Sequence, residues 1–146
     1  MAFYIGSKKE LPIIPYDINK PSFHTTLIGE NEEVIHKHMS FQNILYFGSN
    51  QGCGCGFRHA PLYKGEWLFF EDEEENPPEE QQQNHQELYN YIRTHVENNA
   101  KVEIYGCWEE EFAEDPKLTE EISLDDLINK NFYFKERGFY IVKTGG

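Results

Sequence analysis

One long helical pattern, set between short stretches typical of strands, limits the folds open to this chain of 146 residues. The pattern follows Pro77-Pro78, and proline is common in the first turn of a helix because its missing N–H is not needed there. Residues at helical spacing then form one apolar stripe: Leu88, Tyr91, Ile92, His95 and Val96. Asn98-Asn99 ends the pattern. His85 lies outside the stripe, so we expect it at the surface.

The segments before and after this helix have the composition of strands. Ile44–Phe47 is a continuous apolar run, typical of a strand that is covered on both faces. Residues 101–108 alternate, which places Val102 and Ile104 on one face and Glu103, Tyr105 and Cys107 on the other. We expect further strands at 3–5, 23–28, 67–70, 132–134 and 139–142, the last two as a hairpin around residues 136–138, and short helices at 32–39 and 124–128.

Strands, one long helix and then strands again form an order typical of the α+β class. The strict alternation of strands and helices that a doubly wound fold needs is missing. We therefore predict a single domain over residues 1–146, with a mostly antiparallel sheet of about five or six strands and the long helix packed across one face.

The chain is strongly acidic, with 26 acidic against 13 basic residues and a formal net charge of −13. Such a surface repels nucleic-acid phosphates and anionic lipid headgroups, so we expect neither nucleic-acid nor membrane binding. The segment Met1–Gly6 has no cationic residue and too short an apolar run for a secretion signal. We therefore expect a cytoplasmic protein with reduced thiols.

The acidic residues are concentrated in two runs, with seven in residues 71–80 and seven in residues 109–121. Runs of this kind are usually solvated, but they can also bind a basic protein partner, as small acidic inhibitor proteins do. Residues 34–65, by contrast, contain no Asp or Glu at all.

A glycine-cysteine repeat, Gly52-Cys53-Gly54-Cys55-Gly56, lies within that acid-free segment. Glycine adds no packing and costs backbone entropy, so its repetition indicates a close approach or dihedrals that only glycine adopts. In an extended segment, residues two apart point to the same side, so both sulfurs would face one spot. We expect a ligand-binding site formed by Gly52, Cys53, Gly54, Cys55, Gly56, Arg58 and His59.

Several kinds of chemistry fit this loop. Zinc would take its ligands from Cys53, Cys55, His59 and Cys107, although one residue between cysteines is fewer than zinc sites usually have. A pair of neighbouring thiols also suits redox or nucleophilic chemistry, because one can resolve an intermediate formed on the other. Backbone N–H groups, helped by Arg58 and Lys64, could instead hold a small anion. Close packing of glycines and buried cysteines would need no ligand at all.

The function that these patterns favour is binding of a small ligand or a protein partner at the glycine-cysteine loop. The first alternative is a thiol- or zinc-dependent enzyme that uses the same loop, so the sequence leaves enzymatic activity open. The second is an acidic inhibitor or interaction protein for a basic partner. No cofactor other than zinc is indicated, since motifs such as G-x-S-x-G, H-E-x-x-H and the phosphate-binding loop are missing.

Overall fold

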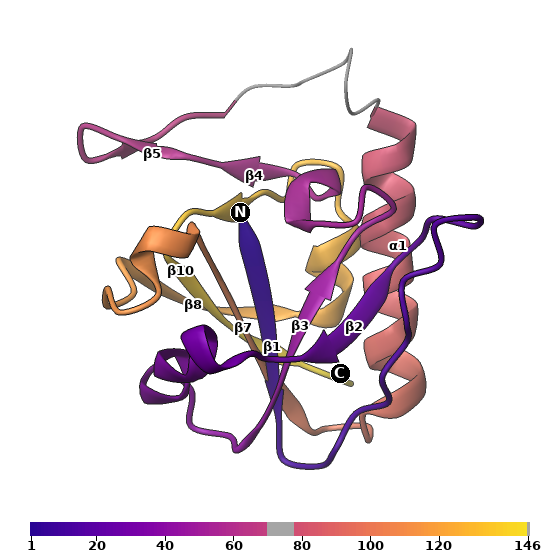
Figure 1. Ribbon diagram of the computed structural model, residues 1–146. Helices are drawn as coiled ribbons and strands as arrows, with labels where there is room; N and C mark the ends of the chain where they lie inside the picture. Colours follow the sequence, from indigo (N-terminus) through magenta and orange to yellow (C-terminus); the bar gives the residue numbers. More distant parts are fainter. Residues whose placement is uncertain (70–77, 146) are drawn as a thin grey trace.

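A six-stranded sheet with the strand order β2-β3-β1-β7-β10-β8 forms the centre of the computed structural model, which describes residues 1–69 and 78–145 (Figure 1). Neighbouring strands are antiparallel except β8 and β10, which are parallel. The helix α1 (Pro78–His95) packs on one face. The predicted α+β class, the sheet size and the helix across one face are confirmed. The strands of the sheet are β1 (Ala2–Ser7), β2 (His24–Leu27), β3 (Asn43–Gly48), β7 (Lys101–Cys107), β8 (Leu118–Ser123) and β10 (Gly138–Lys143).

Smaller elements surround this sheet. Strand β4 (His59–Ala60) pairs with β9 (Phe134–Lys135), and β5 (Leu62–Tyr63) pairs with β6 (Glu66–Trp67). Four 3-10 turns complete the described fold: η1 (Glu30–Lys37), η2 (Gly54–Gly56), η3 (Glu109–Glu111) and η4 (Leu124–Ile128). Among the described helices, none has the length and apolar character needed to span a bilayer.

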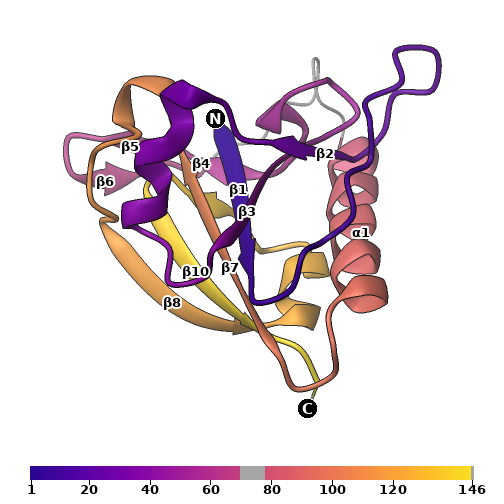
Figure 2. The same ribbon diagram turned by 60° about the horizontal axis from the view of Figure 1, so that its bottom comes forward.

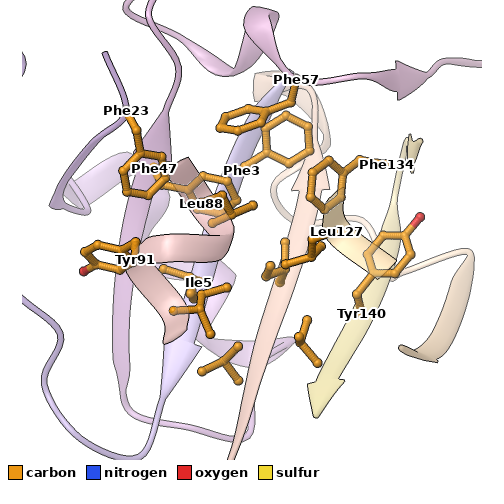
Figure 3. Packing of buried hydrophobic residues seen from close by; sticks show 14 of the residues in the cluster. Phe3, Ile5, Phe23, Phe47, Phe57, Leu88, Tyr91, Leu127, Phe134 and Tyr140 are labelled. Carbon is orange, nitrogen blue, oxygen red and sulfur yellow. The ribbon is translucent and has the colours of Figure 1, made fainter. Parts of the chain in front are cut away.

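Alternation along the strands divides the core into two clusters. The face that carries α1 buries the larger cluster, which includes Phe3 and Ile5 of β1 and Leu88 of the helix (Figure 3). The opposite face buries a smaller cluster around Tyr4 and Cys107, and η1 covers part of it. Figure 2 shows η1 and α1 on opposite sides of β1 and β3. The predicted division of residues 101–108 between the two faces is confirmed, because Val102 and Ile104 belong to the larger cluster and Cys107 to the smaller one. Burial of apolar side chains on both faces stabilises this sheet.

Several expected elements differ in the structure. Phe134 and Phe139 do not face each other in a hairpin, because Glu136 N–H donates to Ala60 and Arg137 N–H to Gly106, so the chain crosses from one sheet to the other. The helices expected at 32–39 and 124–128 are 3-10 turns, η1 and η4. The strand expected at 67–70 overlaps β6 only at residue 67, and residue 70 lies outside the described residues.

Strand β8 was not predicted, because its sequence lies at the end of the second acidic run. Its carboxylates are accommodated by lysines that come later in the chain: Glu120 pairs with Lys135 and Glu121 with Lys143, each at 3.0 Å. The acidic run is therefore part turn and part edge strand.

His85 of α1 is fully buried and His95 is exposed, so both expectations for these residues were wrong. His85 is buried because its ring has two partners inside the fold. Its Nε2 accepts the backbone N–H of Arg58 at 2.9 Å, and its Nδ1 donates to the Leu127 carbonyl at 2.8 Å. Only the neutral ring with a proton on Nδ1 makes both bonds. Burial, followed by the Arg58 charge, lowers the pKa of His85 to about 3.

We expect the free energy of unfolding to fall as the pH decreases from about 6.5 towards 3, because the unfolded chain binds a proton at His85 that the folded chain excludes. Above pH 6.5 this contribution is fully present. Urea unfolding of His85→Gln should show a loss of about 1–3 kcal/mol at pH 7, from the broken buried hydrogen bonds. The variant should then lose less further stability than the wild type between pH 7 and pH 4.5. His36→Gln, at an exposed histidine, is the control. An equal pH slope in His85→Gln and the wild type would contradict this role.

Candidate functional site

The loop after β3 is a compact turn organised by one serine. The Ser49 Oγ donates to the Cys53 carbonyl at 2.7 Å and accepts the Gly56 N–H at 2.9 Å. The backbone N–H of Ser49 also donates to the Cys53 carbonyl, at 2.7 Å. From the helix, the Asn84 side chain donates to the Gly56 carbonyl and accepts the N–H of Asn50. The turn is therefore held from inside and from α1.

Close approach explains the repeated glycines. A Cβ atom on Gly54 would lie 2.3 Å from the Met1 carbonyl oxygen, and one on Gly56 would lie 2.3 Å from the Ser49 Oγ. Both distances are far shorter than a carbon atom tolerates, so only glycine fits at either position. Gly52 has a φ of +80°, in the left-handed region that favours glycine. The sequence predicted either a close approach or dihedrals that only glycine adopts, and the structure shows the first at Gly54 and Gly56 and the second at Gly52.

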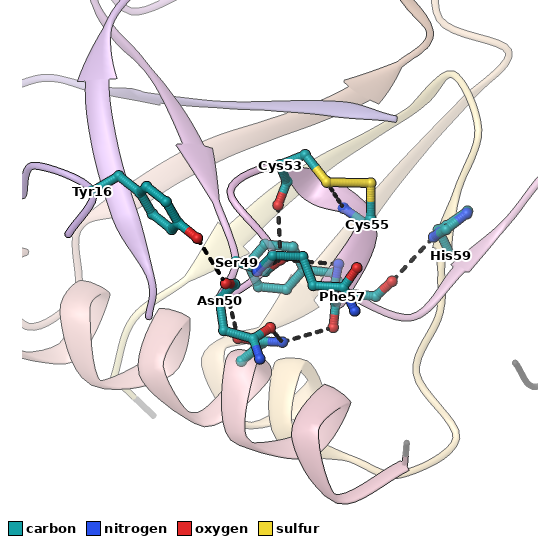
Figure 4. The surroundings of a disulfide bond; sticks show 10 residues. Tyr16, Ser49, Asn50, Cys53, Cys55, Phe57 and His59 are labelled. Atoms are coloured by element: carbon teal, nitrogen blue, oxygen red, sulfur yellow. Dashed lines mark hydrogen bonds between the residues drawn. A yellow bond between two sulfur atoms is a disulfide. The ribbon is translucent and has the colours of Figure 1, made fainter. Parts of the chain in front are cut away.

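The two sulfurs of the loop form a disulfide, Cys53–Cys55, on the side of the turn that faces away from α1 (Figure 4). Cys55 is exposed and Cys53 is half-buried. The backbone N–H of Cys55 donates to the Cys53 Sγ at 3.3 Å. The expectation of reduced thiols does not hold for this pair, because the turn brings both side chains to one spot. Cys107 is a free, buried thiol, and burial raises its pKa to about 12.

Arg58 and His59, the other expected contact residues, are engaged elsewhere. The Arg58 side chain is buried, and its guanidinium donates to Gln82 and to the carbonyls of Asn129 and Phe132. His59 Nδ1 donates to the Phe57 carbonyl at 3.0 Å, and burial lowers the pKa of its ring. Arg58 therefore positions the loop and borders a separate hollow beside the start of α1.

The disulfide forms part of the wall of a hollow of about 580 Å³ on the sheet face opposite α1. Aromatic rings contribute much of the remaining wall: Tyr4, Tyr46, Trp108 and Phe112. Tyr4 and Phe112 are buried, whereas Trp108 is 38% exposed. The Trp108 indole is fixed, because its Nε1–H donates to the Glu136 carboxylate at 2.9 Å and its backbone N–H to Glu111 at 2.9 Å.

Three carboxylates line the same hollow, one from η1 and two from η3. Glu32 is held by two hydrogen bonds, from the Gly29 N–H at 2.8 Å and the Tyr4 hydroxyl at 2.5 Å. Glu109 and Glu110 border it from the other side. Burial raises the pKa of Tyr46, and the nearby charges of Glu32 and Glu109 raise it further. Among the described residues, no Lys, Arg or His side chain lines this hollow, but Met1 does, and burial lowers the pKa of its α-amino group.

The four candidate zinc ligands are not assembled into a metal site. Within residues 1–69 and 78–145, no three His, Cys, Asp or Glu side chains are grouped closely enough to hold an ion. Cys53 and Cys55 are bonded to each other, whereas zinc binds the thiolate form. Zinc binding to the reduced chain stays a prediction.

Comparisons with protein-family models, with curated proteins and with solved structures find no match for this chain.

The sequence singled out the two cysteines that border this candidate site but not the residues across the hollow. Glu32 and Tyr46 belong to separate elements that only the sheet brings together. Glu109 and Glu110 gave a signal as the start of the second acidic run, although nothing in the sequence placed that run beside the cysteines. The carboxylates at the loop thus come from outside the acid-free segment.

We expect Gly54→Ala to lower the free energy of unfolding by about 1–3 kcal/mol or more, because its Cβ would overlap a backbone oxygen that cannot move freely. Urea unfolding measures the loss. Gly6→Ala is the matched control: Gly6 lies outside the left-handed region, and the nearest atoms to a new Cβ, Glu103 Oε1 and Met39 Sδ, would be 3.6 Å away, an ordinary van der Waals distance. If both variants were equally stable, the close approach at Gly54 would not constrain the turn.

Proposed function

We propose that the hollow beside Cys53–Cys55 binds an organic cation, namely an ammonium or guanidinium group on a small molecule or on a basic protein partner. The single observation that carries this proposal is the composition of the wall. Four aromatic rings and three carboxylates line a space of about 580 Å³, against one cationic group among its described lining residues, the α-amino group of Met1, whose pKa burial lowers.

Each part of the wall favours a cation. Aromatic faces attract ammonium and guanidinium groups, with tryptophan the strongest, and a desolvated contact of this kind contributes about 2 kcal/mol. The carboxylates of Glu32, Glu109 and Glu110 add Coulomb attraction from two sides. The hydrogen bonds of Glu32 and Trp108 hold both groups in place before a ligand arrives, which lowers the entropy lost on binding.

The net charge of −13 supports the same class of ligand, because it draws cations towards the protein over longer distances. This proposal joins two features that the sequence kept apart, the glycine-cysteine loop and the second acidic run. It identifies residues 109 and 110 as the part of that run that contacts the ligand. Most of the first acidic run lies outside the described residues and has no part in the proposal.

We expect tetramethylammonium and a short lysine- and arginine-containing peptide to shift the NMR signal of the Trp108 indole N–H more than that of Trp67, which lies outside the hollow. The small ion and the peptide distinguish a metabolite-sized ligand from a protein partner. Replacing all three carboxylates in the variant E32Q/E109Q/E110Q should weaken binding by about tenfold or more, since each exposed charge contributes up to about 1 kcal/mol. Added salt should have the same effect.

The variant E10Q/E66Q/E79Q is the matched control. It removes the same amount of negative charge from positions outside the hollow, so it should bind almost as tightly as the wild type. Equal weakening in both triple variants would mean that only net charge attracts the cation, and the proposed site would be wrong.

A further inference from the structure

The disulfide is open to attack at one of its two sulfurs. Cys55 is exposed and borders the hollow, whereas Cys53 is half-buried. Figure 4 shows that the rest of the turn lies between the two sulfurs and α1. Thiol–disulfide exchange requires an incoming thiolate to reach a sulfur, so access alone favours reaction at Cys55.

The Cys53 sulfur is the better leaving group of the two. The backbone N–H of Cys55 donates to the Cys53 Sγ at 3.3 Å. A hydrogen bond to sulfur stabilises the negative charge that a leaving thiolate acquires, and a better leaving group speeds exchange. Access and leaving-group stabilisation therefore select the same direction of attack.

The disulfide contributes little as a structural link. Only Gly54 separates the two cysteines, and the stabilisation that a cross-link gains from restricting the unfolded chain is smallest for short loops. The turn is already held by Ser49 and by Asn84 from α1. Reduction should therefore leave the fold in place, as a reversible redox site requires.

We propose that Cys53–Cys55 is a redox-active disulfide that oxidises the thiols of a cationic partner. A partner thiolate attacks the Cys55 Sγ, the bond between the two protein sulfurs breaks, and its electron pair goes to the Cys53 Sγ, which takes a proton from water. A second partner thiolate then attacks the partner's sulfur in the mixed disulfide and releases the Cys55 thiolate, which takes a proton from water. Two partner thiols become one disulfide, and the protein becomes a dithiol.

The preference for a cationic partner rests on the proposed function, whereas attack at Cys55 does not. Glu32, Glu109 and Glu110 border the space that the attacking thiol must enter. They attract a thiol that carries a positive charge and repel one that carries a negative charge. The free thiol Cys107 is excluded from this exchange because it is buried in the smaller core cluster.

The position of attack can be measured on the whole chain. The protein is oxidised with diamide, freed of reagent, mixed briefly with cysteamine and quenched with N-ethylmaleimide. Tandem mass spectrometry should find cysteamine on Cys55 and maleimide on Cys53 at least ten times more often than the reverse. Cys107→Ser should give the same result. The fully reduced protein should keep its circular dichroism spectrum.

Four results would overturn the exchange site: no mixed disulfide, equal modification of both cysteines, no disulfide formed by diamide, or loss of the fold on reduction. The charge preference is tested separately, by the rates of the cationic thiol cysteamine and the anionic thiol 3-mercaptopropionate. Comparing each reagent between the wild type and E32Q/E109Q/E110Q cancels differences in thiol reactivity. We expect the variant to slow cysteamine about tenfold at low salt and to speed 3-mercaptopropionate.

The two proposals fail in different ways. Exchange at Cys55 with no charge preference would leave the redox site standing and remove the cation site. Binding of tetramethylammonium at Trp108 with no mixed disulfide would leave the cation site standing and remove the redox site.

Discussion

Hydrogen bonds between buried polar groups of α1 and the loop after β3 determine how this molecule is assembled. Asn84 and His85 satisfy backbone groups of residues 50, 56 and 58, and His85 also reaches η4. A buried polar group without a partner costs about 1–3 kcal/mol, so the helix cannot rotate or slide on the sheet without losing these bonds. The apolar stripe of the helix selects the face of the sheet, and the polar residues select the register.

The two faces of the sheet consequently differ in how completely they are covered. The face under α1 is packed with aromatic and aliphatic side chains, and Phe57 at the end of the cysteine turn anchors the loop in that core. The opposite face is covered only in part by η1 and η3, which leaves the hollow between them. The turn at Gly54 reaches over the end of β1, so the disulfide belongs to the open face while its supports belong to the closed one.

What could be predicted from the sequence depended on how local the signal was. The helix stripe and the alternation of residues 101–108 are short-range periodicities, and both predicted the correct faces except at His95. The burial of His85 could not be predicted, because its partners lie at residues 58 and 127. Strand β8 was missed for the same reason, since its ion-pair partners Lys135 and Lys143 follow it in the chain. The repeated glycines and paired cysteines indicated one part of the candidate site, but its carboxylates come from η1 and η3, which no local pattern connects to the loop.

The burial of Cys107 limits which disulfides this chain can form. Three sulfurs allow three pairings, yet Cys107, at the end of β7 and opposite Ala2, is fully buried in the smaller core cluster, and burial keeps it in the thiol form. A protonated, inaccessible sulfur neither attacks a disulfide nor reacts readily with peroxide. The chain therefore has only one internal disulfide to form, Cys53–Cys55, and the thiol exchange proposed for it need not scramble bonds or damage the interior.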